Sequence, residues 1–277
     1  MRDRRPAAWR DIVRIDKLDT SNLREGVFCG HGKPRPDAMY DQMEAWLDGN
    51  LLRGQIARAD DGEVAGFVLY YPIEHAPLDV DGKGLYLMQC IFVKPKYQKS
   101  GIGRALFQAS IADAQANGAT GIAVEGFSER EKDGFEYKPG AFFAHMGMTP
   151  SDTRGQGMLY YVGFKEEVEP PHYLEPNFKP RPTTTPKIKV DILDCRRCYT
   201  FVNNRNLVEA VLEQAGREKF EVEIHDQNHR EAIVDKGMST GVFIDGKLTF
   251  FEGPISEDDV WNAIEIAEEA RRQATDR

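Results

Sequence analysis

The stretch VKPKYQKSGIGRAL, residues 93–106, decides how the first part of this sequence folds. The continuous apolar run Leu85–Val93 leads into it, which is typical of a strand at the centre of a sheet covered on both faces. Apolar residues at helical spacing follow it, so we expect a helix from about Gly101 to Asn117. Backbone N–H groups at the start of a helix attract anions, and Gly101 and Gly103 put no Cβ atom in the way of one. The stretch therefore predicts an anion-binding turn between a strand and a helix.

Two common phosphate-binding loops do not fit this turn. Walker A requires Gly-x-x-x-x-Gly-Lys-Ser/Thr and the dinucleotide fingerprint requires Gly-x-Gly-x-x-Gly, whereas position 106 is leucine. The residues do match the pattern Gln/Arg-x-x-Gly-x-Gly/Ala from Gln98 to Gly103, and the wider pattern V-x-P-x-x-Q-x-x-G-x-G-x-x-L from Val93 to Leu106. In both respects the sequence resembles the GNAT acetyltransferases, over about residues 11–164.

The segments around the turn predict an α/β (α+β) fold with a mixed sheet, as the GNAT resemblance implies. A hairpin is expected about Asp61-Gly62. The other expected elements are a strand at Asp11–Ile15, a helix at Asp37–Leu47, a strand at Gly121–Phe127, a short helix at Gly140–His145 and a strand at Gly157–Phe164.

The resemblance implies acetyl-CoA as cofactor and assigns residues to its parts. Its pyrophosphate would lie on the turn Gln98, Lys99, Ser100, Gly101, Ile102, Gly103 and Arg104, and its pantetheine arm would pair with Ile91, Phe92 and Val93. Lys96, Lys99 and Arg104 either meet further phosphate charge or are solvated surface side chains. An amine would attack the thioester, and catalysis would consist chiefly of positioning and electrostatic stabilisation.

The catalytic residues depart from the pattern common in the family. Leu85–Val93 carries Gln89 and Cys90 in place of a carboxylate, and Phe142–Met148 lacks the tyrosine that often acts as the acid. Glu125, at the end of a buried strand, is the candidate base, because burial can raise the pKa of a carboxylate toward neutrality. Tyr137 is the candidate acid. The alternatives are a carboxylate that reaches solvent and an ordinary loop tyrosine.

Cys29 and Cys90 are the other unusual feature of this region. Cys29 belongs to a segment that helps to wall the acceptor pocket in the family, and Cys90 lies on the central strand. Two thiols facing the pocket would suit a soft acceptor or an acyl relay. The alternative is a pair of small buried apolar residues.

Prolines divide the chain. Six of the fifteen prolines lie between Lys165 and Lys187, and proline favours a stiff, extended spacer over a sheet interior or a helix. We therefore expect a GNAT domain at residues 1–165, a linker at residues 166–186 that shares no sheet with either side, and a second domain at residues 187–277.

The second domain resembles thioredoxin-like domains. The expected order is β-α-β-α-β-β-α, with Cys195-Arg196-Arg197-Cys198 after the first strand. Ser239-Thr240-Gly241 stands where such domains usually place a proline before the hairpin. The combination of domains resembles the YoaP-type GNAT proteins, which share the stretches 241–243, 245–247 and 254–256.

The two cysteines of this motif predict thiol–disulfide chemistry. We expect the helix to open at Cys195, so that the helix dipole lowers the pKa of its thiol and Cys198 acts as the resolving thiol. The rival interpretation is a zinc site made by Cys195, Cys198, His225 and His229. Its spacing is far from that of zinc fingers, and we assign no metal.

Composition excludes several classes of protein. The 277-residue chain has a net charge of −9, which argues against a nucleic acid or an anionic membrane as partner. No apolar run approaches the roughly 20 residues that span a bilayer, and the first residues lack the apolar core of a secretory signal. We expect a cytoplasmic acetyl-CoA-dependent N-acetyltransferase that acts on a small amine-bearing or thiol-containing acceptor, fused to a redox domain. The alternative is a non-catalytic acyl-CoA sensor coupled to a thiol or metal switch.

Overall fold

A computed structural model describes residues 14–28, 35–127, 138–181, 183 and 185–275. Contacts between backbone segments group the chain into two compact units, which are described separately. The first unit extends as far as Tyr173, and the second comprises residues 174–277 together with the short segments Pro36–Gln42 and Pro77–Asp79. In the described part of the chain, no helix has the length and apolar character needed to cross a membrane.

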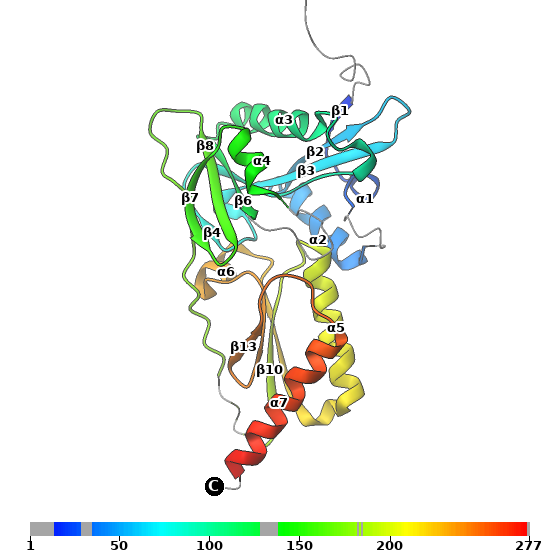
Figure 1. The fold of residues 1–277 in the computed structure, drawn as a ribbon, viewed down its shortest axis with the longest axis vertical. Coiled ribbons are helices and arrows are strands. Elements are labelled where there is room, and N and C mark those ends of the chain that lie inside the picture. Colours follow the sequence, from blue (N-terminus) through cyan, green and yellow to red (C-terminus); the bar gives the residue numbers. More distant parts are fainter. Residues whose placement is uncertain (1–13, 29–34, 128–137, 182, 184, 276–277) are drawn as a thin grey trace, which may run out of the picture. The chain divides into compact units, whose positions relative to one another are not determined.

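A seven-stranded mixed sheet forms the centre of the first unit (Figure 1). Its strands, in spatial order, are β1 (Arg14–Lys17), β2 (Arg53–Arg58), β3 (Val64–Pro72), β5 (Leu85–Val93), β6 (Gly121–Phe127), β8 (Gly157–Gly163) and β7 (Thr149–Arg154). Among the described strands of this sheet, β5 and β6 are the one parallel pair, and the helix between them makes the parallel crossover. A separate pair joins β4 (Val80–Asp81) to β9 (His172–Tyr173).

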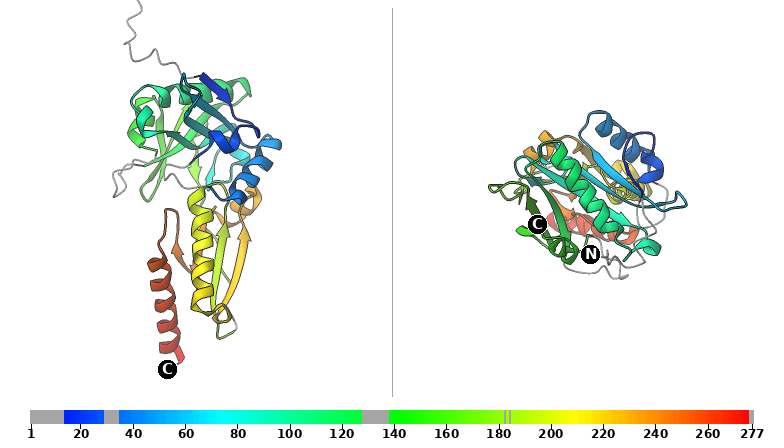
Figure 2. Two further views of the ribbon diagram at one scale, coloured as in Figure 1. Left: turned by 90° about the vertical axis from the view of Figure 1, so that its right-hand side faces the viewer. Right: turned by 90° about the horizontal axis from the view of Figure 1, so that it is seen from above.

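Helices cover both faces of this sheet. They are α1 (Leu23–Gly26), α2 (Asp37–Asp48), α3 (Ile102–Ala116) and α4 (Gly140–His145). In Figure 1 and in the right-hand view of Figure 2, α3 lies along one face of the strands. On the opposite face, Trp46 of α2 packs edge-on against Tyr71 of β3, with ring centroids 5.6 Å apart.

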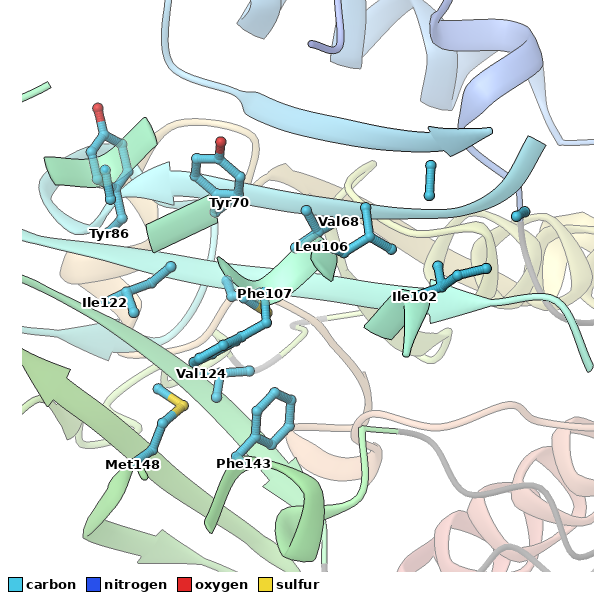
Figure 3. Close-up of a cluster of buried hydrophobic side chains, with 14 residues drawn as sticks. Val68, Tyr70, Tyr86, Ile102, Leu106, Phe107, Ile122, Val124, Phe143 and Met148 are labelled. Atoms are coloured by element: carbon cyan, nitrogen blue, oxygen red, sulfur yellow. The ribbon is translucent and has the colours of Figure 1, made fainter. Parts of the chain in front are cut away.

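The main core lies under α3 (Figure 3). Leu106 and Phe107 of α3 pack against Ile122 and Val124 of β6, and Phe143 of α4 closes the cluster. Burying a side chain of this kind stabilises the fold by about 1.5 to 3 kcal/mol. This packing holds the start of α3 next to the end of β5.

The sequence predicted most elements of this unit. β5, β6 and α4 have the predicted bounds, and α3 and β8 differ from them by one residue at the ends. Only the first five residues of β5 are buried, so the expectation of a strand covered throughout is wrong for its last four residues. The strand β7 and the β4–β9 pair were not predicted.

The proline-rich segment does join a sheet, contrary to the prediction. Val80 pairs with Tyr173 and Asp81 pairs with His172 in an antiparallel ladder. The pair needs only two residues that retain their N–H groups, and His172 and Tyr173 follow the Pro170-Pro171 pair directly. The start of the expected linker is therefore part of the first unit.

The second unit contains a four-stranded sheet with the order β11-β10-β12-β13. The strands are β10 (Ile188–Asp194), β11 (Phe220–Asp226), β12 (Gly241–Ile244) and β13 (Lys247–Phe250). β10 is parallel to β11 and antiparallel to β12. The helices are α5 (Tyr199–Gly216), α6 (Arg230–Lys236) and α7 (Glu257–Thr275), and α5 and α7 bury one core with the sheet.

One helix of the second unit begins later than predicted. The first residue of α5 is Tyr199, so Cys198 is its N-cap and Cys195 lies in the preceding turn. The side chain of Asn228 accepts a hydrogen bond from the backbone N–H of Arg196 at 2.8 Å, and this contact holds the turn outside the helix. Reciprocal hydrogen bonds between Ser256 and Asp259 form a capping box at the start of α7.

A partly buried ion pair fixes α3 to the sheet. Both side-chain oxygens of Asp113 accept hydrogen bonds from Arg53, at 2.7 and 2.8 Å, and Tyr70 donates a third at 2.8 Å. Burial on its own would raise the pKa of Asp113, but the bonds from Arg53 and Tyr70 outweigh it, so this pKa lies below its ordinary value.

We predict that Asp113→Ala lowers the free energy of unfolding by about 2 to 3 kcal/mol, because Arg53 loses its partner in a partly buried site. The control is Glu44→Ala, which removes a surface ion pair with Arg24 and should change stability by less than about 0.5 kcal/mol. A depressed pKa means that the Asp113 contribution is complete above about pH 4 and is lost as the pH falls further. Urea titrations of both variants measure this, and equal losses would contradict the assignment.

Candidate functional site

The pairing between the two central strands of the first unit stops partway. β5 and β6 are in register from Leu85 and Gly121 to Met88 and Val124, although both strands continue beyond these residues. Beyond Met88, β5 stays paired with β3 alone. The edge of residues 89–93 that lies beyond the end of the β5–β6 ladder is called the open edge here. Such an edge can pair with an extended ligand.

A bulge occurs where the open edge begins. Leu69 of β3 faces Cys90, but the next residue, Tyr70, faces Met88, so the register skips Gln89. A bulge redirects side chains and increases local twist. Gln89 is buried and accepts a hydrogen bond from the Tyr71 hydroxyl at 2.7 Å. The bulge and the end of pairing coincide, and together they separate β5 from β6.

The bulge also sorts the side chains of β5 between two faces. Ile91 and Val93 pack against the core under α3. Cys90 lies opposite Leu69, and Phe92 lies opposite Phe67, whose ring contacts Phe28 on the other face. The Cys90 side chain is partly exposed, so it is not the fully buried apolar residue that was its alternative interpretation.

The turn that follows β5 is built from its own hydrogen bonds. The Gln98 side chain donates to the carbonyl of Val93 at 3.1 Å, and the Ser100 hydroxyl donates to the carbonyl of Tyr97 at 2.5 Å. Lys99 and Gly101 have φ values of 61° and 91°, in the left-handed region. The chain enters α3 with the backbone N–H groups of its first residues ahead of the first helical hydrogen bond, which Ala105 donates to Gly101.

The fold has room for a side chain at Gly103. A Cβ atom at this position would meet the Phe142 ring at 3.6 Å and a Val93 methyl at 3.9 Å, which are ordinary contact distances. The helix would therefore accept alanine here, and alanine favours helices over glycine by about 1 kcal/mol. A glycine in this first turn instead leaves its backbone open to a group from outside. This fits a phosphate at the N-terminus of α3.

One of the three cations expected to meet phosphate is engaged elsewhere. Hydrogen bonds from Lys96, and then from Lys94 and Tyr97, lower the pKa of Glu63 to about 2. Lys96 is thereby held by a carboxylate next to the turn. Arg104 lies 3.1 Å from the Nε2 atom of His145 in α4, at the start of α3.

Glu125 lies one residue beyond the last β5–β6 pair, in a buried polar cluster. Because Ile122 and Val124 face the core under α3, Glu125 faces the opposite side of the sheet. The Tyr173 hydroxyl donates to its Oε1 atom at 2.9 Å, and the Lys138 ammonium lies 3.5 Å from its Oε2 atom. Lys138 is only 4% exposed. A charged pair in such a place fixes the carboxylate in one orientation.

Two further residues hold Tyr173 in this cluster. Its backbone N–H donates to Asp152 at 2.8 Å, and the Arg154 guanidinium lies 4.3 Å from the centre of its ring. Sequence reasoning missed Tyr173 because a two-residue strand inside a proline-rich segment carries no periodic pattern. The predicted acid Tyr137 and the predicted pocket residue Cys29 lie outside the described residues, so their roles stay predictions.

The second unit departs from the predicted thiol pKa of Cys195 and from the alternative zinc site. Cys195 is 1% exposed, and burial raises the pKa of its thiol to about 11, the opposite of the predicted lowering. The alternative zinc site is not formed by its four described residues. His225 instead lies 2.9 Å from Asp191, and the Lys189 ammonium lies between Asp191 and Glu223, 3.7 and 2.8 Å from their oxygens.

Comparisons with known proteins place the first unit. Residues 12–132 match the model of the acetyltransferase (GNAT) family. The part of the chain that forms the mixed sheet is therefore similar to the GNAT acetyltransferases, a family of acyltransferases.

A curated relative is the uncharacterized N-acetyltransferase YoaP of Bacillus subtilis (strain 168), which is 22% identical over 137 residues. This match covers 49% of the present chain and 53% of the relative, so the chain spans about half the length of the curated relative that it matches.

Two solved structures are also similar. The PaiA N-acetyltransferase of Thermoplasma acidophilum in complex with coenzyme A is 16% identical, covers 55% of this chain and 99% of its own, and gives a TM-score of 0.41. A GNAT acetyltransferase of Brucella melitensis in complex with acetyl-CoA is 17% identical, covers 58% and 93%, and gives a TM-score of 0.38.

We predict that Gly157→Ala disrupts the Glu125 cluster. A Cβ atom at this residue would lie 2.8 Å from the Tyr173 hydroxyl and 2.9 Å from Glu125 Oε1, so both groups must shift. Overpacking of this kind costs about 1 to 3 kcal/mol of folding free energy. The matched control is Gly103→Ala, for which there is room, and it should leave the melting temperature unchanged or higher. A Gly157→Ala variant as stable as the wild type would contradict this packing.

Proposed function

We propose that this protein transfers the acetyl group of acetyl-CoA to the amine of a small acceptor, in the cytoplasm. The observation that carries the proposal is the open edge of β5 followed directly by the glycine turn at the start of α3. A ligand with an extended amide-bearing arm and a pyrophosphate would use both features at once. The complexes of the two solved relatives with coenzyme A and acetyl-CoA are consistent with this assignment.

In this proposal the parts of acetyl-CoA have separate sites. The first backbone N–H groups of α3 and the turn from Gln98 to Arg104 would hold the pyrophosphate, where the helix dipole favours negative charge. Ile91, Phe92 and Val93 would pair with the pantetheine arm through their backbone N–H and C=O groups. The open edge would then direct the thioester toward Gln89 and Cys90, where the strands separate.

Glu125 is the proposed base. It faces the side of the sheet opposite the α3 core, as Cys90 does, and it follows the last residue paired with β5. Its carboxylate would accept a proton from the acceptor amine, directly or through one water molecule, as the nitrogen attacks the acetyl carbon. Tyr173 and Lys138 would hold the carboxylate in place, and Cys90 would line the wall on the acceptor side. Backbone N–H groups at the bulge would stabilise the charge on the carbonyl oxygen.

For the second unit we propose a thioredoxin-like redox domain at residues 187–277. Its sheet order, with a parallel pair next to an antiparallel hairpin and a Cys-x-x-Cys motif after the first strand, supports this proposal. The linker of the proposal is the stretch from Leu174 to Pro186, shorter than the sequence alone indicated.

We predict that Gly103→Asp weakens acetyl-CoA binding at least about tenfold, or about 1.4 kcal/mol, because a carboxylate in the first turn of α3 repels the pyrophosphate proposed there. Isothermal titration calorimetry measures this. The control is Gln108→Ala, on an exposed position of the same helix, which should bind as the wild type does. Undiminished binding by a folded Gly103→Asp variant would exclude the turn as the phosphate site.

We predict that Glu125→Gln lowers kcat/KM about 10²- to 10⁴-fold, the range for loss of a general base, while acetyl-CoA binding is kept. Release of free thiol from acetyl-CoA, with a panel of small amines, amino acids and thiols as acceptors, measures turnover. Glu167→Gln, an exposed carboxylate of the same unit, is the control. If the wild type binds acetyl-CoA and turns over none of the acceptors, the sensor alternative replaces the enzyme.

A further inference from the structure

The two thiols of the second unit occupy different environments. Cys198 is the N-cap of α5, an 18-residue helix, and its side chain is partly exposed. Cys195 lies in the turn before the helix and is buried. The thiol at the start of the helix and in contact with solvent is therefore the second cysteine of the motif.

The surroundings of Cys195 keep its thiol protonated. Its sulfur donates to the carbonyl oxygen of Pro77 at 3.8 Å, and Pro77 belongs to a short segment of the same unit. Burial is the main cause of its raised pKa, and the charge of Arg197, whose Nη1 atom lies 3.8 Å from the sulfur, opposes it only in part. Because the thiolate is the nucleophile in disulfide exchange, a buried and protonated Cys195 is a poor attacking group.

Several contacts hold this arrangement. The Asn228 side chain accepts a hydrogen bond from the backbone N–H of Arg196. The Asp194 carboxylate accepts hydrogen bonds from the side chains of Arg196 at 3.0 Å and Arg205 at 2.7 Å. The negative charge of Asp194 is thus neutralised by two guanidinium groups of the same unit. The Arg197 guanidinium stacks on Phe201 of α5, 4.5 Å from its ring centre. The turn is fixed on both sides, with Cys195 inward and Cys198 at the helix start.

We propose that Cys198 is the attacking thiol of a disulfide-exchange site and that Cys195 is the resolving thiol. This order is the reverse of the one that the sequence alone predicts, and it rests on the redox role proposed for the second unit. The Cys198 side chain is partly exposed at the start of α5, where a disulfide from solution can reach its sulfur, whereas the Cys195 sulfur is buried. The proposed substrate is a disulfide whose sulfur reaches the exposed side of Cys198.

The proposed thiol–disulfide exchange has two steps. The Cys198 thiolate attacks one sulfur of a disulfide R–S–S–R′, so that a Cys198–S–S–R bond forms and R′–S⁻ leaves and takes up a proton. The Cys195 sulfur then attacks the Cys198 sulfur, and its proton leaves with R–S⁻ as a thiol. Two protein thiols become one disulfide, and the substrate disulfide gains the two electrons.

The sequence provides a direct test, because Arg196 and Arg197 separate the two cysteines. Trypsin cleaves after arginine, so Cys195 and Cys198 fall in different peptides of the reduced chain. Brief treatment of the reduced full-length protein with iodoacetamide at neutral pH should label the Cys198 peptide at least about tenfold faster than the Cys195 peptide. In urea, where both environments are lost, the two peptides should be labelled at similar rates.

Single substitutions test the same order by a second route. With oxidised glutathione as the disulfide, Cys195→Ser should form a stable mixed disulfide at Cys198, and Cys198→Ser should react much more slowly at Cys195. Faster labelling of Cys195 in the wild type, or a Cys198→Ser variant as reactive as Cys195→Ser, would overturn the proposed order and leave the redox role in place. If oxidised glutathione produces no Cys195–Cys198 disulfide in the wild type, the redox role itself is wrong.

Discussion

The site in the first unit depends on one interruption in a sheet, the end of hydrogen bonding between β5 and β6 after Met88 and Val124. Had the parallel ladder continued, β6 would occupy the edge of residues 89–93 to which the extended ligand is proposed to bind. The bulge at Gln89 fixes the point at which β5 and β6 separate, because the register between β5 and β3 shifts at the same residue. The open edge, the exposure of Cys90 and the position of Glu125 beyond the last pair all follow from this separation.

A second constraint keeps the two halves of the proposed cofactor site aligned. The open edge belongs to β5 and the anion-binding N–H groups belong to α3, so the site requires a rigid connection between strand and helix. Leu106 and Phe107 bury the helix against the sheet, and the pair of Arg53 with Asp113 fixes its far end. The N-cap residue of α3, Gly101, makes no side-chain capping hydrogen bond. The first N–H groups of the helix therefore point toward the proposed phosphate site without a capping side chain in between. Packing at one end of α3 supports chemistry at the other.

Local patterns predicted the elements of the chain well, and contacts distant in sequence were beyond them. The apolar run of β5 and the glycines of the turn each depend on neighbouring residues. The end of the β5–β6 ladder depends on pairing across more than 30 residues, and no local pattern encodes it. Tyr173 reaches Glu125 from 48 residues away, through a strand too short to show alternation. α5 begins after Cys195 and not at it, because Asn228, 32 residues after Arg196, accepts a hydrogen bond from the backbone N–H of Arg196.

The central claim is that a single ligand occupies the open edge of β5 and the first turn of α3 together. Amide hydrogen exchange of the full-length protein, followed with and without acetyl-CoA, tests this claim most directly, because both features consist of backbone N–H groups. The account predicts slower exchange in peptides that cover Ile91–Val93 and Gly101–Arg104, with smaller changes in β1 and β2. Protection confined to the turn, or protection elsewhere with neither segment affected, would contradict it.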